Sequence, residues 1–350
     1  MIDVMPPQAV AARGFSIVEV LISVTIGLFI IIGVVSIYAA TSKSYTLHES
    51  ESRLQEAGRY AFSILEPDVR MAGYWGLAKG AVSVAGSFSQ ASAAATGLTP
   101  PTPSCGTNFV FDVKTAIEGS NNSYPLTCPA FSAAAPSADT LTVRHASVTP
   151  STIAAGTVAL RICSSFVAAS LVSTATGCPI EPVTVPAAGN TTANVNGGVY
   201  DLIVNSYYIN QRSSTIPGLP TLYRQTFSNL TNTMVNTEIL PGVEDMQVQF
   251  GIDPTGTTGV ASQYVNALTA TALYNASTVA TAQIVAVRIW LLLRADNPEP
   301  GFTDTRIYSY ADRTGAAATT LTANNAYQPA DHYRRLLVTR TIMLRNAVGT

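Results

Sequence analysis

Few residues in this 350-residue chain have the type and spacing that chemistry needs. Three histidines, His48, His145 and His332, are the candidates for general acid or base catalysis, but none lies in a recognisable catalytic setting. The chain has no Gly-x-Ser-x-Gly motif for a serine nucleophile, no Walker motif and no Gly-x-Gly-x-x-Gly motif for a nucleotide. We therefore expect no enzymatic activity and no small-molecule substrate.

Two oxygen-rich turns are the candidate cation sites. The first is DPTGTTG, which begins at Asp253, and the second is DNPEPGFTD, from Asp296 to Asp304. Carboxylate and carbonyl oxygens are the ligands that calcium prefers, but neither turn has EF-hand spacing. Solvated loops are the better interpretation, and we expect no metal and no cofactor.

Four cysteines could form disulfides. Cys105, Cys128, Cys163 and Cys178 are far apart and include no C-x-x-C pair, so zinc is not expected. An even number of cysteines beyond a membrane segment favours an oxidising compartment. Nearest-neighbour pairing, Cys105–Cys128 and Cys163–Cys178, is the preferred connectivity, and each loop closure is worth about 3 kcal/mol. Four reduced, buried cysteines are the alternative.

Charge gives little support for a nucleic-acid partner. Only 11% of the residues are charged, and the formal net charge is −2. A local basic cluster near the C-terminus consists of Arg334, Arg335, Arg340 and Arg345. Such a patch could bind phosphates, but a groove for DNA normally adds exposed aromatic residues. We expect these arginines to pair with carboxylates of the same chain or to contact another subunit.

A single carboxylate at the start of an apolar run is the remaining group of interest. Glu19 precedes the stretch from Val20 to Ala40, in which Tyr38 is the only ionisable side chain. As a helix, this stretch spans roughly 30 Å, which predicts a transmembrane segment. An unpaired carboxylate in a membrane costs several kcal/mol and tends to mark function. Simple snorkelling of Glu19 to the lipid headgroups is the alternative.

The short leader before this segment differs from a secretory signal. A secretory signal has a shorter apolar region that is followed by its cleavage site, whereas here Arg13 and Gly14 come directly before the apolar run. Arg13, the only basic residue of the leader, places the leader in the cytoplasm by the positive-inside rule. The rest of the chain is then outside, in the periplasm of a bacterium.

The residues from Gly14 to Glu19, GFSIVE, resemble the cleavage motif of type IV prepilins. The resemblance implies that a membrane-embedded prepilin peptidase cuts between Gly14 and Phe15 and methylates the new amino group of Phe15. It also implies that Glu19, the fifth residue of the mature chain, pairs with the N-terminal amine of a neighbouring subunit. Glu19 would then set the register of assembly.

The pattern beyond the membrane predicts that the helix continues into the soluble part. One apolar stripe with spacings of three and four residues is formed by Leu54, Ala57, Gly58, Ala61, Leu65, Val69 and Ala72. This stripe should pack on a sheet. Pro67 predicts a kink or break at Glu66-Pro67. The stretch from Asp68 to Tyr74 is similar to the DxRxAGY helix ending of PilW-type minor pilins.

The rest of the sequence predicts loops followed by strands. Residues 78–135 are rich in small and turn-forming residues and read as long loops pinned by the first cysteine pair. Strand patterns occur in TLTVRHASV, TVALRIC, VYDLIVNSYYIN, TLYRQTF, GVEDMQVQFGID, AQIVAVRIWLLLRA and YRRLLVTRTIMLRNA. In GVEDMQVQFGID one face carries Met246, Val248, Phe250 and Ile252, and the other carries Gln247 and Gln249. The order of the last three patterns resembles PilW-like minor pilins and the related J-type pseudopilins of type II secretion.

The predicted fold class is therefore α+β and pilin-like. A long N-terminal α-helix, part transmembrane and part amphipathic, packs on an antiparallel β-sheet with long disulfide-pinned loops. The expected parts are a prepilin leader peptide at 1–14, a transmembrane and filament-core helix at 15–40, its amphipathic continuation at 41–75, and a periplasmic β-rich body at 76–350.

The resemblance implies a structural subunit, a minor pilin in the tip complex that initiates assembly of a type IV pilus and supports a large tip adhesin. It implies partners among the other minor pilins, the major pilin, the prepilin peptidase and the inner-membrane assembly platform. The location implied is the inner membrane of a Gram-negative bacterium and then the pilus tip. The alternatives are a J-type minor pseudopilin and a tip pilin that binds DNA or a surface through loops at 78–135 or 164–199.

Overall fold

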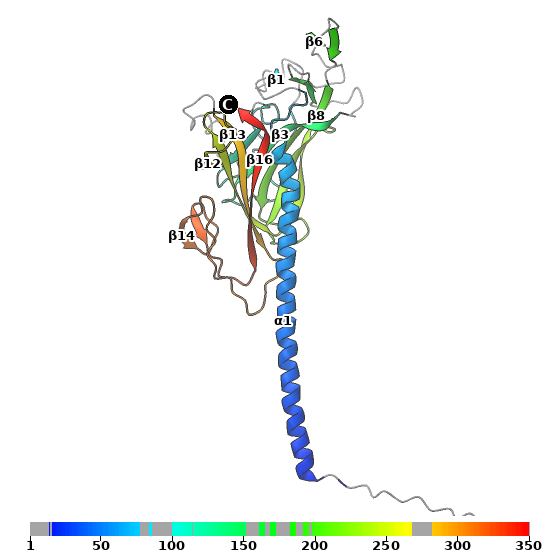
Figure 1. The fold of residues 1–350 in the computed structure, drawn as a ribbon, viewed down its shortest axis with the longest axis vertical. Helices are drawn as coiled ribbons and strands as arrows, with labels where there is room; N and C mark the ends of the chain where they lie inside the picture. Colours follow the sequence, from blue (N-terminus) through cyan, green and yellow to red (C-terminus); the bar gives the residue numbers. More distant parts are fainter. Residues whose placement is uncertain are drawn as a thin grey trace, which may run out of the picture. The chain divides into compact units, whose positions relative to one another are not determined.

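The computed structural model contains two compact units, Met1–Ser52 and Arg53–Thr350. The structure describes residues 14, 16–77, 84–85, 100–113, 115–151, 161–164, 169–172, 183–186, 192–195, 198–267 and 282–349. Helix α1 extends from Ile17 to Arg70 and belongs to both units, and the strands belong to the second unit (Figure 1).

In the first unit, α1 exposes apolar side chains on every side from Ile17 to Tyr38. This part of the helix is long and apolar enough to cross a membrane, and none of it is buried. A helix that is hydrophobic all round needs apolar surroundings. The apolar stretch that the sequence predicts as a membrane segment is thus an uncovered helix in the structure.

The predicted break at Glu66-Pro67 is wrong, because α1 continues through Pro67 to Arg70. Proline removes the hydrogen bond from its own nitrogen to the carbonyl of Ser63, and its ring crowds that carbonyl. Ser63 and Pro67 are exposed, so water can solvate that carbonyl without disturbing the packed face. Leu65 and Val69 remain fully buried on the opposite side.

The end of α1 is tied to the body by backbone hydrogen bonds. Gly73 follows the helix with a φ of 73°, the left-handed conformation that suits glycine at a helix C-terminus. Its N–H donates to the carbonyl of Arg144 at 3.1 Å, and the N–H of Ala146 donates to the carbonyl of Tyr74 at 2.6 Å. The chain after the helix therefore runs beside the strand that contains Arg144 and Ala146.

Two sheets form most of the second unit (Figure 1). Among the described residues the larger sheet has eight strands in the order β1-β5-β4-β8-β3-β2, and β9 and β10 extend from β8. Its strands are β1 Val84–Ala85, β2 Ile117–Ser120, β3 Thr140–Pro150, β4 Arg161–Ser164, β5 Ala169–Val172, β8 Gly198–Asn210, β9 Thr221–Ser228 and β10 Thr233–Pro241. Only the β1–β5 pair is parallel among its described pairs.

The second sheet is antiparallel in the order β12-β11-β13-β16. Its strands are β11 Val243–Asp253, β12 Gln263–Asn266, β13 Gln283–Arg294 and β16 Arg335–Gly349. Two further strand pairs stand apart, β6 Val183–Pro186 with β7 Thr192–Val195, and β14 Gly315–Ala318 with β15 Asn325–Tyr327. The architecture is the predicted one, a long N-terminal helix on antiparallel sheets.

A single buried core joins the second half of α1 to both sheets. The predicted stripe is confirmed, because Leu54, Gly58, Ala61, Leu65, Val69 and Ala72 are buried and Ala57 is partly buried. The core side chains opposite it come from the larger sheet, such as Leu141 and Val204, and from the second sheet, such as Val248, Phe250 and Ile289.

Gly58 allows α1 to approach the second sheet closely. A Cβ atom at this position would lie 3.2 Å from Leu293 Cδ1 and 3.2 Å from Val338 Cγ1. We expect Gly58→Leu to lower the free energy of unfolding by about 1–3 kcal/mol, because the added side chain overpacks this contact. Thermal unfolding of the full chain in detergent measures the change. Gln55→Leu adds the same side chain on the exposed face, and an equal loss there would contradict the prediction.

Strand β11 shows the predicted alternation, but both of its faces are covered. Met246, Val248, Phe250 and Ile252 lie in the main core. Gln247 and Asp245 on the other face are also buried. Gln247 donates to the carbonyl of Ser137, and Asp245 contacts Arg313 of the segment of residues 295–334 that connects β13 to β16. This segment carries β14 and β15, the orange part of Figure 1.

Cys105 and Cys128 form a disulfide, as the nearest-neighbour pairing predicts. It joins two parts of the region predicted as loops, which also contains the short strands β1 and β2. Cys163 is buried in β4, whereas Cys178 lies outside the described residues. The Cys163–Cys178 pairing therefore stays a prediction.

Candidate functional site

Glu19 lies in the first turn of α1, two residues after the helix begins at Ile17. A carboxylate is favourable there, because the helix dipole leaves partial positive charge at the N-terminus. The hydroxyl of Ser23 donates to the backbone carbonyl of Glu19 at 2.7 Å and so does not serve the carboxylate. Within the described residues the Glu19 carboxylate has no hydrogen-bond or ion-pair partner and is exposed among apolar side chains.

The predicted cleavage point lies directly before this turn. Gly14 is exposed ahead of the helix, and Phe15 lies outside the described residues. The first backbone hydrogen bond of the helix runs from the N–H of Val20 to the carbonyl of Ser16, at 3.1 Å. Glu19 is thus five residues after Gly14 in the sequence and lies in the first turn of the helix.

At the other end of α1, the Asp68 carboxylate is hydrogen-bonded to three side chains of β3 and β8. His145 Nε2 lies 2.8 Å from Asp68 Oδ1. Asn205 Nδ2 donates to both carboxylate oxygens at 3.0 and 3.1 Å, and the hydroxyl of Tyr207 donates to Oδ2 at 2.9 Å. We call Asp68, His145, Asn205 and Tyr207 the helix-end cluster.

The contacts of His145 indicate that its ring is doubly protonated. Nε2 faces the Asp68 carboxylate and Nδ1 lies 2.8 Å from the carbonyl of Ala146, so both nitrogens face acceptors and both must donate. Burial opposes the charged form, but the hydrogen bond and charge of Asp68 prevail and raise the pKa of His145. The cluster is therefore a charged pair between helix and sheet in which both partners are largely buried.

Sequence reasoning missed this cluster. It assigned His145 no catalytic role and treated Asp68 only as part of a helix-ending motif. The two residues are 77 positions apart, and no local pattern connects them. The available signal was the occurrence of polar side chains in strongly β-forming stretches, because a polar residue inside a sheet needs a partner.

A second buried ion pair lies on the far face of β11, between Arg313 and Asp245, whose side chains are both 0% exposed. The guanidinium donates to the two Asp245 oxygens at 2.6 and 2.9 Å. It also donates to the carbonyls of Ser137 and Thr322 at 2.6 and 2.7 Å, and the Tyr310 hydroxyl donates to Asp245 at 2.7 Å. This pair fastens the 295–334 segment to the second sheet.

Three of the four C-terminal arginines pair with carboxylates of the same chain. Arg335 contacts Glu244 and Asp331, Arg334 contacts Glu299, and Arg340 contacts Glu66 on α1. The expectation of internal pairing is therefore confirmed for these three. Arg345 is exposed near the end of α1.

Residues 206–346 match the sequence profile of the family described as Type IV Pilus-assembly protein W. This segment is similar to PilW proteins and covers 141 of the 350 residues. It extends from β8 into β16, so it contains β11, β12, β13, most of β16 and the Arg313–Asp245 pair. The predicted recognition is confirmed, and the chain is a pilin-like protein of type IV pilus assembly.

The structure is also similar to that of a type IV-like pilin from Thermus thermophilus. The TM-score is 0.32 and the sequence identity is 15%, over 84% of this chain and 96% of that chain. A comparison of the sequence with curated proteins found no match.

The first candidate cation turn lies in the PilW segment, and its carboxylate is used by the turn itself. Asp253 accepts hydrogen bonds from the N–H and the hydroxyl of Thr255, from the same two groups of Thr258, and from the N–H of Gly259. Desolvation raises the pKa of Asp253, but these hydrogen bonds together outweigh it and hold the pKa well below its usual range. The carboxylate therefore faces donors rather than a cation.

The second candidate turn of the PilW segment uses its acids in ion pairs. Glu299 contacts Arg334, and Asp304 contacts Arg306 and accepts a hydrogen bond from the Tyr308 hydroxyl at 2.8 Å. No group of three or more histidine, cysteine or acidic side chains with the geometry of a metal site occurs in the described part of the chain.

The three histidines have separate environments. His48 is exposed on α1, and His145 belongs to the helix-end cluster. His332, in the PilW segment, has Nδ1 at 2.5 Å from the carbonyl of Phe302. The structure thus gives one of them a clear role, attachment of the helix to the sheet.

Proposed function

We propose that this protein is a minor pilin in the tip complex that initiates assembly of a type IV pilus and supports a tip adhesin. The PilW segment supports a place in pilus assembly. The observation that carries the finer proposal is the position of Glu19, on an exposed apolar helix and five residues after Gly14.

In this proposal, the prepilin peptidase removes the leader, residues 1–14, and methylates the amino group of Phe15. The apolar helix at 15–40 holds the precursor in the inner membrane and later packs in the filament core. Residues 41–75 contain the rest of the helix, which ends at Arg70, and residues 76–350 form the body, which is periplasmic before assembly. The assembled protein lies at the pilus tip on the surface of a Gram-negative bacterium.

Glu19 would fix the axial position of this helix relative to a neighbouring subunit in the filament. Cleavage after Gly14 would create an ammonium group four residues from the carboxylate. In an apolar filament core each charge is costly alone, and pairing with the opposite charge of a neighbouring subunit reduces that cost. Only a subunit in correct register brings the two groups together.

The partners proposed for this subunit are the other minor pilins, the major pilin, the tip adhesin, the prepilin peptidase and the inner-membrane assembly platform. We propose no enzymatic activity, no cofactor and no nucleic-acid partner. The protein would act through its contacts, and energy for assembly would come from the platform.

The test is surface piliation in a deletion strain complemented with wild type, Glu19→Ala or Ser23→Ala. We expect Glu19→Ala to reduce rescue at least about tenfold, because it removes one partner of a desolvated charge pair. Ser23→Ala, four residues further along the same helix, is the control and should rescue normally. Mass spectrometry of the wild-type protein should find N-methylated Phe15 at the N-terminus.

Other outcomes would favour other functions. Normal pili together with blocked secretion of a folded exoprotein would favour a J-type pseudopilin. A wild-type chain that retains Met1, together with normal piliation in the deletion strain, would contradict both assignments.

A further inference from the structure

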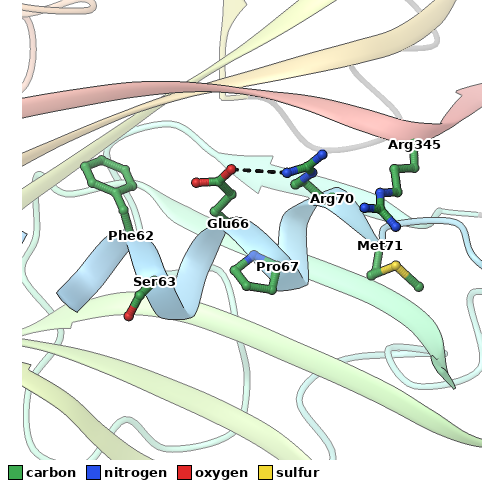
Figure 2. A pocket seen from close by; sticks show the side chains of 7 residues that line it. All are labelled: Phe62, Ser63, Glu66, Pro67, Arg70, Met71 and Arg345. Carbon is green, nitrogen blue, oxygen red and sulfur yellow. Dashed lines mark hydrogen bonds and ion pairs between the residues drawn. The ribbon is translucent and has the colours of Figure 1, made fainter. Parts of the chain in front are cut away.

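A pocket of about 280 Å³ lies beside the last turns of α1 (Figure 2). Its apolar part consists of Phe62, Pro67 and Met71, and its charged part consists of Glu66, Arg70 and Arg345. Figure 2 shows Arg345 reaching from β16 toward the helix beside Met71. All these residues belong to the second compact unit.

The pocket region has more positive than negative charge. Glu66 is the one carboxylate of the pocket lining, and it is shared by Arg70 Nη1 at 3.4 Å and Arg340 Nη1 at 2.6 Å. The side chains of Arg70 and Arg340 are 44% and 52% exposed. Arg345 is exposed and has no ion-pair partner in the part of the chain that the structure describes. Three guanidinium groups thus face one carboxylate.

The backbone holds Arg345 near the helix end. Strand β16 changes register against β13 between Met343 and Val348, so Arg345 lies in an irregular stretch of the strand. The next residue, Asn346, donates from Nδ2 to the carbonyl of Ala72 at 3.5 Å, just after α1 ends. The position of Arg345 is therefore set by the fold rather than by an ion pair.

Pro67 leaves one backbone carbonyl beside the pocket without its usual helical donor. Pro67 has no N–H, so the carbonyl of Ser63 has no donor within the helix. Ser63 and Pro67 both line the pocket. A ligand with an N–H beside a carboxylate would match both this carbonyl and the guanidinium groups.

We propose that this pocket binds an acidic side chain of a neighbouring pilin subunit. The inference rests on the proposed function, which supplies such neighbours. The carboxylate is held by Arg345 and Arg70 through charge-assisted hydrogen bonds, and its methylene stem covers Met71 and Pro67. The backbone N–H next to the acidic side chain donates to Ser63. A nucleic acid fits less well, because the pocket is short and contains its own carboxylate.

Photo-crosslinking in the native bacterium tests the proposal. The full chain carries p-benzoylphenylalanine in place of Tyr60, an exposed aromatic residue one helical turn before Ser63. We expect an adduct with another pilin subunit, and mass spectrometry should place an Asp or Glu in or beside the crosslinked peptide. Arg345→Glu should reduce the adduct about tenfold, because an interface charge pair becomes a repulsive one. Arg212→Glu makes the same charge change at an exposed position on the loop after β8 and should leave the adduct unchanged.

Charge exchange provides the decisive comparison. Replacing the crosslinked carboxylate of the partner with arginine should restore the adduct of the Arg345→Glu chain. Equal adducts in the Arg345→Glu and Arg212→Glu chains, adducts only with lipid or nucleic acid, or no adduct would overturn the proposal. Arg345→Gln is the milder variant if Arg345→Glu lowers the amount of folded protein.

The two proposals fail in different ways. Suppose that Phe15 is N-methylated and Glu19→Ala loses its pili, but Arg345→Glu does not reduce the crosslinked adduct. These results would reject only the pocket proposal. Retention of Met1 would reject the pilin function itself.

Discussion

Replacing Asp68 with alanine is expected to lower the free energy of unfolding by about 3–5 kcal/mol, the range for breaking a buried ion pair. The substitution removes the counter-charge of His145, so the ring must either stay charged in the core without a partner or lose its proton. Asn205 and Tyr207 lose their acceptor at the same time. Thermal unfolding of the full chain in detergent, followed by tryptophan fluorescence, measures the effect, since Trp75 is fully buried shortly after the helix.

The pH dependence of stability identifies the cause. In the wild type the pKa of His145 is raised above its ordinary value of 6.5. The pair therefore contributes fully below about pH 6.5, and its contribution is lost as the pH rises through the folded-state pKa. In Asp68→Ala, burial favours the neutral ring of His145 and only the hydrogen bond to the carbonyl of Ala146 still favours the charged one. The penalty of Asp68→Ala should thus be larger near pH 6 than near pH 9.

Asp296→Ala is the matched control for this prediction, because Asp296 is exposed. Its effect should stay within about 0.5 kcal/mol. A penalty in Asp68→Ala that is equally small, or that does not change with pH, would show that the charged pair does not hold the helix to the sheet.

Arg313→Met should destabilise the protein to a similar extent, by about 3–5 kcal/mol. Asp245 is completely buried and would lose its only cationic partner among the described residues. The carbonyls of Ser137 and Thr322 would each lose one donor as well, although the Gln247 amide still donates to Ser137 and the N–H of Asn325 still donates to Thr322. The same thermal unfolding measurement applies, with Arg212→Met as an exposed control.

The sign of the pH effect follows from Asp245. Burial raises its pKa above the ordinary 3.8, and Arg313 opposes that rise. An acid with a raised folded-state pKa destabilises the native state above that pKa, and the cost disappears as the pH falls. Without Arg313 the pKa rises further, so the penalty of Arg313→Met should decrease on acidification from neutral pH.

A double variant separates the charge from the packing. Arg313→Met with Asp245→Leu removes both charges and fills the space with apolar atoms, which is often nearly neutral for a buried pair. It should regain most of the stability that Arg313→Met loses. A double variant as unstable as the single one would attribute the loss to the carbonyls and the packing of the 295–334 segment.

Features with a local repeat could be predicted from the sequence. The stripe from Leu54 to Ala72 has helical spacing, and the apolar residues of β11 alternate, so both faces are visible within a short window. The first disulfide followed from neighbouring cysteines. These predictions needed no knowledge of how distant segments meet.

The features that sequence reasoning missed depend on tertiary contacts. Strand β10 has a mixed polar pattern and is defined by pairing with β9. Pro67 appeared to break α1, yet the packing of Leu65 and Val69 is enough to continue the helix by one more turn. The charged partners Asp68–His145 and Asp245–Arg313 are far apart in the chain. Each pair comes into contact only when the sheet that carries one of its residues has formed.

The close contact at Gly58 also constrains how the chain acquires its structure during synthesis. Helix residues that emerge early pack against Leu293 of β13 and Val338 of β16, which emerge near the end. Contacts of such long sequence separation form late and slow the acquisition of the native state. The part of α1 around Gly58 therefore has no native surface to cover it until β13 and β16 are made, whereas residues of the larger sheet such as Leu141 and Val204 are available to the same core earlier.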